Sequence, residues 1–315
     1  MTDTTNIEVQ AIYQAAERGD AVAQVNLANM FYFGQDMEQS FEKAFEWYSK
    51  AAEQGEVQAQ LNLGSMYGYG EWVEQSFEKA HMWHERAATQ GDADAQYSLG
   101  GMYLLGEGVD KNPDKAIEWF LKAATQGHSS AQYNLGLMYE RGEGAGQDYE
   151  KAFEWYSKAA EQGDAKAQTN LGFCYTLEQG VGQSYEKAFE WFLKAAEQGY
   201  VFAQHCLGKM YELGEGVNQD FVKAFKWQQK SAEQGDLHAL YSLSCMYSSG
   251  NGTIKSYTKA YAYILVAKAT ANQNLSLYQD IEEQEALLEN LLPLARQIRA
   301  QDEAIKIWKR INNPG

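Results

Sequence analysis

The chain has 315 residues and a formal net charge of −17 at pH 7, from 43 acidic and 26 basic side chains. Nucleic acids and anionic lipid surfaces recruit clustered lysine and arginine, so this charge argues against both as partners. The chain has no apolar run near the ~20 residues that a membrane-spanning helix needs.

The first residues and the cysteines bear on the compartment. Residues 1–6 are polar and lack the basic and apolar regions of a secretory signal. Cys174, Cys206 and Cys245 form an odd, scattered set, which indicates free thiols in a reducing compartment. We expect a cytoplasmic protein, and the alternative is export by a route without a cleavable signal.

A glycine recurs every 36 residues, which predicts one structural unit stacked seven times. These glycines are Gly19, Gly55, Gly91, Gly127, Gly163, Gly199 and Gly235. We expect an N-terminal capping helix in residues 1–19, repeats in residues 20–271 and C-terminal capping helices in residues 272–315. The seven repeats are 20–55, 56–91, 92–127, 128–163, 164–199, 200–235 and 236–271.

The first expected element is a lone helix over residues 7–18 that covers the first repeat. Each repeat then predicts a helix, a turn and a second helix, as the third repeat illustrates. Asp92 caps its first helix, Gly106 supplies the left-handed residue that ends it, and Pro113 suits the first position of its second helix.

The residue before each second helix is of an N-cap type. These residues are Ser40, Ser76, Asn112, Asp148, Ser184, Asp220 and Ser256. On the outer face of the second helix, Glu and Lys recur four residues apart, as in Glu118 and Lys122, and we expect such pairs to keep that face soluble. Alanines and the tryptophan column of Trp119 are expected to form the core.

After the seventh repeat, residues 277–311 predict an amphipathic helix that is interrupted or restarted at Pro293. Its apolar face either covers the last repeat or joins two copies of the chain into a homodimer. This face consists of Leu287, Leu291, Leu294, Ile298, Ile305 and Trp308.

The repeat resembles the Sel-one-like repeat family, a branch of the tetratricopeptide superfamily. The motif is clear in Ala131-Gln132-Tyr133-Asn134-Leu135-Gly136-Leu137-Met138-Tyr139, followed by Lys151-Ala152 and Trp155. The resemblance covers residues 20–271 and implies an all-α, right-handed α-solenoid that binds other proteins as an adaptor. The motif is broken at three positions, Ala28, Ser244 and Glu178. These departures put the local backbone geometry in question but not the fold. The cysteine-rich branch pairs two cysteines within each repeat; this chain does not, so the extracytoplasmic setting of that branch is not carried over.

On each first helix, the positions that hardly vary between repeats fall on one side. The opposite side is expected to line the inner, concave wall, as in the resembling superfamily. It carries rings and side-chain amides, which favours a groove for an extended peptide. Alternatively, the rings pack against neighbouring repeats and the amides brace them. The candidate partner-binding residues are Tyr97, Tyr133, Asn134, Leu137, Arg141, Asn170, Phe173, Phe202, His205, Lys209 and Tyr241.

Four S-x-x-K sequences match a motif of serine β-lactamases and penicillin-binding proteins. They begin at Ser40, Ser76, Ser184 and Ser256, and aspartate replaces the serine at Asp148 and Asp220. The chain has neither S-D-N nor K-T-G, so N-capping explains the serines better than nucleophilic catalysis.

His81 and His84 could share a metal, but they occupy aromatic columns without an evident third ligand, so we expect no metal or cofactor. His205 beside Cys206 also lacks an orienting third group. The sequence therefore predicts a non-enzymatic scaffold that binds a partner protein or peptide. The alternative is a β-lactam- or peptidoglycan-directed hydrolase or binding protein, as claimed for some cysteine-rich relatives.

Overall fold

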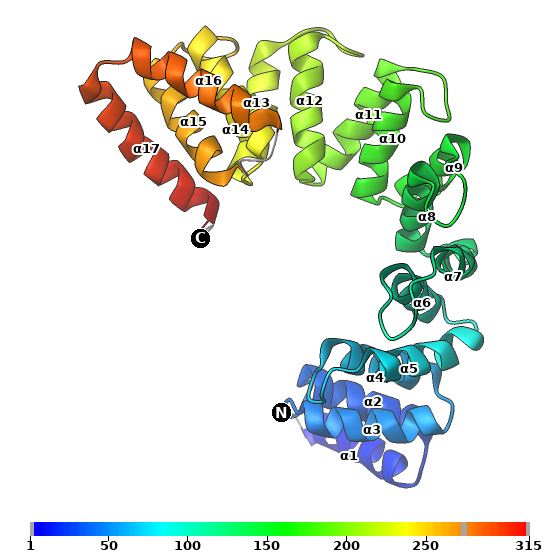
Figure 1. Ribbon diagram of the computed structural model, residues 1–315. Coiled ribbons are helices and arrows are strands. Elements are labelled where there is room, and N and C mark those ends of the chain that lie inside the picture. The colour runs from blue at the N-terminus through cyan, green and yellow to red at the C-terminus, as the bar shows by residue number, and fades with distance from the viewer. Residues whose placement is uncertain (1–2, 272–275, 313–315) are drawn as a thin grey trace. The chain divides into compact units, whose positions relative to one another are not determined.

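The structure is a computed structural model that describes residues 3–271 and 276–312 of the chain. Over these residues it contains 17 helices and no strand, which confirms the predicted all-α helical repeat fold (Figure 1). The predicted capping segments 1–19 and 272–315 include residues 1–2, 272–275 and 313–315, which lie outside the described residues.

Each repeat contributes two helices. The first helices are α2 (Ala21–Phe33), α4 (Val57–Tyr69), α6 (Ala93–Leu105), α8 (Ser129–Arg141), α10 (Ala165–Leu177), α12 (Val201–Leu213) and α14 (Leu237–Ser249). The second helices are α3 (Phe41–Glu53), α5 (Phe77–Thr89), α7 (Pro113–Thr125), α9 (Tyr149–Glu161), α11 (Tyr185–Glu197), α13 (Phe221–Glu233) and α15 (Tyr257–Thr270). Before the repeats lies α1 (Asp3–Glu17), and after them lie α16 (Ser276–Leu291) and α17 (Leu294–Asn312).

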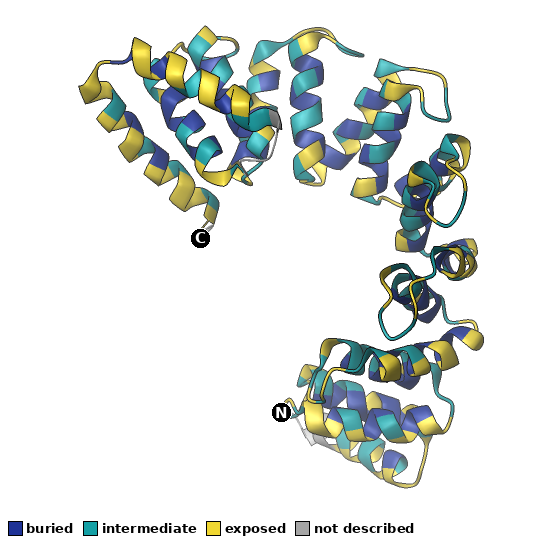
Figure 2. Cartoon of the chain, viewed as in Figure 1, coloured by how far each residue is buried: buried dark blue, intermediate teal, exposed yellow. Residues whose placement is uncertain are grey.

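The helices form two compact units. The N-terminal unit, residues 1–155, holds α1 to α8 and the first part of α9, and the C-terminal unit, residues 156–315, holds the remaining helices. Figure 2 shows buried residues along the sides where helices of one unit meet, and exposed residues on their outward sides. Each unit therefore has its own core.

The helix ends follow the predicted caps. Asn112 Oδ1 accepts a hydrogen bond of 3.0 Å from the amide of Lys115, and the other six N-cap residues bond in the same way. Gly106 ends α6 with a φ of 80°. Glu178 ends α10 in the same left-handed conformation, with a φ of 58°, so this departure from the motif keeps the geometry.

A small residue in each first helix lets a large side chain of the second helix pack against its backbone. A Cβ on Gly100 would lie only 2.5 Å from the Phe120 ring, and Phe120 is fully buried. In the seventh repeat the glycine is replaced by Ser244, whose hydroxyl donates a 2.8 Å hydrogen bond to the carbonyl of Ala260. The small residue that recurs at this position in the repeats thus sets how closely the two helices approach.

A ladder of buried glutamines joins neighbouring repeats. In six repeats a first-helix glutamine donates from Nε2 to an alanine carbonyl of the preceding helix, at 3.0–3.2 Å. These pairs are Gln24 and Ala16, Gln60 and Ala52, Gln96 and Ala88, Gln132 and Ala124, Gln168 and Ala160, and Gln204 and Ala196. The same glutamine accepts from a second one after the next helix, as Gln96 does from Gln126 at 2.8 Å.

The outer lysines have a different partner from the expected one. Lys122 Nζ lies 3.6 Å from the centre of the Trp119 ring, and Lys50 and Lys194 lie over their tryptophans in the same way. A cation over an indole face is attracted by the ring quadrupole. These lysines therefore cover the tryptophans, which are half-buried at Trp119.

The C-terminal helices bury a different face from the predicted one. The cluster around α15 includes Ile281, Leu288, Leu292, Ala300 and Ala304. All six residues of the predicted apolar face are instead exposed, by 44–71%. The expectation that this face covers the last repeat is therefore wrong, because α17 packs a different face, with Ala300, Ala304, Ile307 and Ile311, against the cluster around α15.

Candidate partner-binding face

The predicted partner-binding residues lie mostly at the boundary between core and solvent. Nine of them are half-buried, and Arg141 and Phe202 are exposed. The half-buried ones are Tyr97, Tyr133, Asn134, Leu137, Asn170, Phe173, His205, Lys209 and Tyr241. They form what we call the first-helix face of each unit.

Some of these rings contact the neighbouring repeat. Tyr97 stacks on His128 with centroids 4.5 Å apart, and His128 Nε2 lies 3.2 Å from an oxygen of Asp94. In the C-terminal unit, Phe173 lies 5.1 Å from Phe192 and 5.6 Å from Phe202. These rings therefore brace adjacent repeats, as the alternative interpretation expected, while part of each ring stays accessible.

The last position of the first helix carries a column of exposed apolar side chains, which the sequence analysis did not select as binding residues. Tyr69 is 78% exposed and Leu105 is 65% exposed. The column consists of Phe33, Tyr69 and Leu105 in the N-terminal unit and Leu177 and Leu213 in the C-terminal unit. A comparison of this one position across the seven repeats would have found the column, because five repeats carry an apolar residue there. The other two carry the polar residues Arg141 and Ser249.

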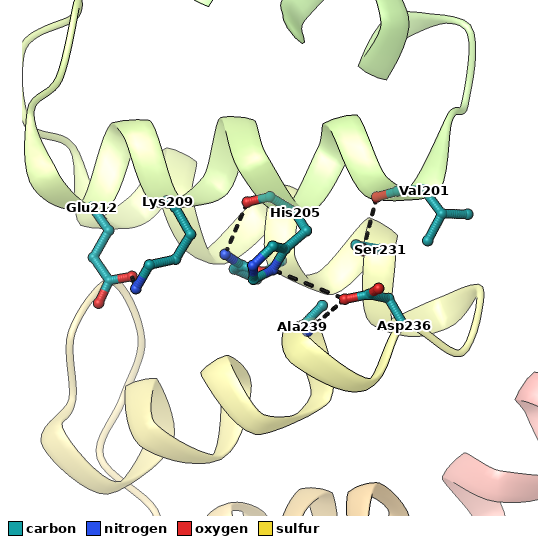
Figure 3. Close-up of polar contacts among 8 residues, drawn as sticks. Val201, His205, Lys209, Glu212, Ser231, Asp236 and Ala239 are labelled. Carbon is teal, nitrogen blue, oxygen red and sulfur yellow. Dashed lines mark hydrogen bonds and ion pairs between the residues drawn. The ribbon is translucent and has the colours of Figure 1, made fainter. Parts of the chain in front are cut away.

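In the sixth repeat, polar side chains replace the usual apolar ones and satisfy one another (Figure 3). His205 Nδ1 lies 2.9 Å from Gln228 Oε1, and since an amide oxygen only accepts, Nδ1 is the donor. Gln228 Nε2 donates back to the carbonyl of His205, and Ser231 donates to the carbonyl of Val201. Asp236 Oδ1, which caps α14, lies 3.9 Å from His205 Nδ1. Burial lowers the pKa of His205, so this network holds a neutral imidazole.

The candidate nucleophiles are held in unreactive environments. Burial raises the pKa of the Cys206 thiol to about 12, so it is protonated at neutral pH. Each S-x-x-K serine caps its helix, accepting from the lysine amide at 3.3 Å. The lysine Nζ lies 5.0–5.3 Å from a ring centre, over Phe31, Tyr67, Tyr175 or Tyr247.

Within residues 3–271 and 276–312, no cluster of three His, Cys, Asp or Glu side chains could hold a metal ion. Over the same part of the chain, no helix has the length and apolar character needed to cross a bilayer.

The Sel1 repeat family model matches residues 21–56, 57–92, 93–128, 129–164, 165–200, 201–236 and 237–267. The chain belongs to the Sel1 repeat family. Sel1 repeats are generally protein–protein interaction modules, and proteins built from them are generally non-enzymatic scaffolds.

Two solved structures are similar over most of this Sel1 repeat protein. A Sel1 repeat protein from Oxalobacter formigenes is 33% identical, with a TM-score of 0.72, over 89% of this chain and 80% of that one. The Escherichia coli protein c5321, a protective antigen of uropathogenic strains displaying an SLR fold, is 32% identical, with a TM-score of 0.62, over 98% of this chain and 74% of that one. A search of curated proteins finds no match.

Proposed function

We propose that this Sel1 repeat protein is a non-enzymatic adaptor that binds an extended segment of a partner protein on its first-helix faces. The column of exposed apolar side chains carries the proposal, because large apolar side chains that recur exposed at one position of the repeat are typical of an interaction surface. Half-buried rings and amides such as Tyr133 and Asn134 lie on the same face and offer hydrogen bonds to a peptide backbone.

The test replaces three members of the column with serine, the residue that the seventh repeat carries at this position. Tagged wild type and the variant Leu105→Ser, Leu177→Ser, Leu213→Ser are used to capture proteins from lysate of the source cells. We expect partners that the wild type retains and the variant loses, with an unchanged circular dichroism spectrum.

The matched control is Val222→Ser, which changes an equally exposed apolar residue on a second helix. The control is expected to retain the same partners as the wild type. If the triple variant captures them equally well, the first-helix face is not the binding surface.

We also propose that the C-terminal helices associate with a second copy of the chain, because six large apolar side chains of α16 and α17 are exposed. Light scattering after size exclusion tests this. The wild type is expected to be a dimer and Leu294→Glu, Ile298→Glu a monomer with a native spectrum. At a protein concentration of about 0.1 mM, a dimer with a dissociation constant of about 1 µM would be almost fully formed. A monomeric wild type at that concentration would rule the dimer out.

A further inference from the structure

The junction between the first two repeats is closed by a tyrosine of the chain itself. Tyr32, in the last turn of α2, donates a 2.7 Å hydrogen bond to Glu71 Oε2, in the turn after α4. This bond raises the pKa of the Tyr32 hydroxyl to about 12, so the hydroxyl is a donor at neutral pH. The centre of its ring lies 5.0 Å from that of Phe33, 5.2 Å from Phe41 and 6.5 Å from Tyr48.

The junction between the second and third repeats has similar surrounding residues but lacks the tyrosine. The position 36 residues after Tyr32 holds Gly68, and a cavity of about 230 Å³ lies beside it, lined by α4, α5 and α6. Gly101 widens the cavity, since a Cβ there would meet nothing within 4 Å. The residues that correspond to the neighbours of Tyr32 all line this cavity, and they are Tyr69, Phe77, His84 and Glu107.

Two of the residues that line the cavity have a side-chain polar group without a hydrogen-bond partner among the described residues. The Glu107 carboxylate makes no hydrogen bond or ion pair with any residue that the structure describes. The His84 side chain is only 6% exposed, and its Nδ1 has no hydrogen-bond partner within the described part of the chain. In the sixth repeat, the residue at the position of His84 is Gln228, which is satisfied by His205, but the second repeat has Leu61 at the latter position. Because His84 Nδ1 is shielded from solvent, the unpaired group that a molecule in the cavity can reach is the Glu107 carboxylate.

We propose that this cavity, which we call the tyrosine pocket, binds a tyrosine side chain of the partner segment. The inference rests on the adaptor function proposed above and specifies one residue of its partner. The bound ring lies against Tyr69, Phe77 and His84, and its hydroxyl donates to Glu107, as Tyr32 does to Glu71. Tyr32 in the first repeat thus shows the position that the bound tyrosine would take one repeat later.

The same arrangement makes the pocket selective. A phenylalanine fills the apolar part but leaves the Glu107 carboxylate unpaired. A phosphotyrosine brings about 1.5–2 negative charges against that carboxylate and is repelled. Phosphorylation of the partner tyrosine therefore releases it.

The test titrates the full-length protein, labelled in its histidine rings, with N-acetyl-tyrosinamide and follows the His84 Cε1–H resonance by NMR. The resonance is assigned by its loss in His84→Phe. A single side chain in an open pocket is expected to bind with a dissociation constant on the order of 1 mM. N-acetyl-phenylalaninamide is expected to bind about tenfold more weakly, because a hydrogen bond to a carboxylate is lost. N-acetyl-phosphotyrosinamide is expected not to bind.

Gly68→Tyr is the decisive variant, because it installs the residue of the first repeat in the pocket. A Cβ at this position meets only the Ala80 Cβ, at an ordinary 3.7 Å, and the cavity of about 230 Å³ lies beside it. We expect this variant to abolish binding of N-acetyl-tyrosinamide. Gly68→Ala, the matched control, also removes the helix-interior glycine but adds only a methyl group, and it is expected to bind within about threefold of wild type. Glu107→Ala is expected to remove the preference for tyrosine over phenylalanine.

Equal binding to wild type and Gly68→Tyr, or equal binding of the tyrosine and phenylalanine amides to wild type, would overturn the tyrosine pocket. These outcomes are separate from a failure of the adaptor function. Suppose that partner capture is lost in the variant of the exposed column, but Gly68→Tyr binds N-acetyl-tyrosinamide like the wild type and captures the same partners. The adaptor function is then supported and the tyrosine pocket is not. If the amide binds as expected and no partner depends on the exposed column, the pocket stands without that adaptor surface.

Discussion

Gln126 donates a 2.8 Å hydrogen bond from Nε2 to Oε1 of Gln96, which lies 30 residues earlier in the chain. Gln96 in turn donates to the carbonyl of Ala88 in the preceding repeat. One buried amide therefore connects two repeats and adds a second hydrogen bond to a helix-end carbonyl that also accepts from the amide of Gly91.

Replacement of Gln96 by leucine should destabilise the protein. Leu240 occupies this position in the seventh repeat, so the shape is tolerated, but the two side-chain hydrogen bonds of Gln96, to the Ala88 carbonyl and from Gln126, are lost. We expect the free energy of unfolding to fall by about 1–3 kcal/mol, measured by urea denaturation. The exposed Gln58→Leu on α4 is the control and should change it by less than about 0.5 kcal/mol. Equal effects of the two substitutions would contradict a structural role for the ladder.

The buried His84 should make stability depend on pH. Burial lowers its pKa to about 4, whereas a histidine of the unfolded chain protonates near pH 6.5. Between these values the unfolded state binds more protons, so the free energy of unfolding falls as the pH decreases. The maximum contribution of this residue is on the order of 3 kcal/mol, and it is fully retained above about pH 6.5.

His84→Phe should remove this contribution, because the third repeat already packs Phe120 at the same position. We expect the urea midpoint of the variant to fall less than that of wild type between pH 7 and pH 4.5. His205, whose pKa is also lowered, and the carboxylates titrate in both proteins and cancel in the comparison. Parallel pH profiles would show that His84 is protonated without cost in the folded state.

Glu178→Gly should stabilise the C-terminal unit. Glu178 adopts a φ of 58°, where a Cβ costs about 1–2 kcal/mol and glycine has no such cost. The expected gain is about 1 kcal/mol in thermal or urea unfolding, since glycine also loses more backbone entropy. Glu178→Ala removes the same carboxylate without relieving the backbone, so a gain of equal size in this control would assign the effect to charge.

Two adjacent leucines of α16 should respond in opposite ways. Leu288 is fully buried in the cluster around α15, whereas Leu287 is 53% exposed. Leu288→Ala should cost about 2–5 kcal/mol, as buried leucines typically do. Leu287→Ala should cost less than about 1 kcal/mol, because most of that side chain stays in water. Similar losses in both variants would mean that the buried face of α16 is misassigned.

Local signals predicted the fold well. The N-caps such as Asn112 and the left-handed glycines such as Gly106 act within a few residues, so a repeating pattern is sufficient to place them. The roles of the glutamines could not be read from the same pattern, because their bonds join residues 30 apart in sequence. The buried face of α17 was mispredicted for a similar reason. The prediction chose the side of α17 that carries Ile298, whereas the side that packs against α15 combines Ala300 and Ala304 with Ile307 and Ile311.

The contacts of the proposed binding face could be predicted only in part. Aromatic columns identified Tyr97 and Phe173, but the sequence does not tell how much of a ring its neighbours cover. The tyrosine pocket is harder still, because its signature is the absence of a side chain at Gly68. Only the contacts of Tyr32 reveal what that absence leaves open.

Because every rung of the glutamine ladder joins a repeat only to its immediate neighbour, removing or duplicating one whole 36-residue block restores the same bonding at the new seam. Gain or loss of a complete repeat among the first six therefore leaves this hydrogen-bonding pattern intact. A deletion whose ends fall at different positions of the repeat, by contrast, breaks these side-chain hydrogen bonds at the new seam.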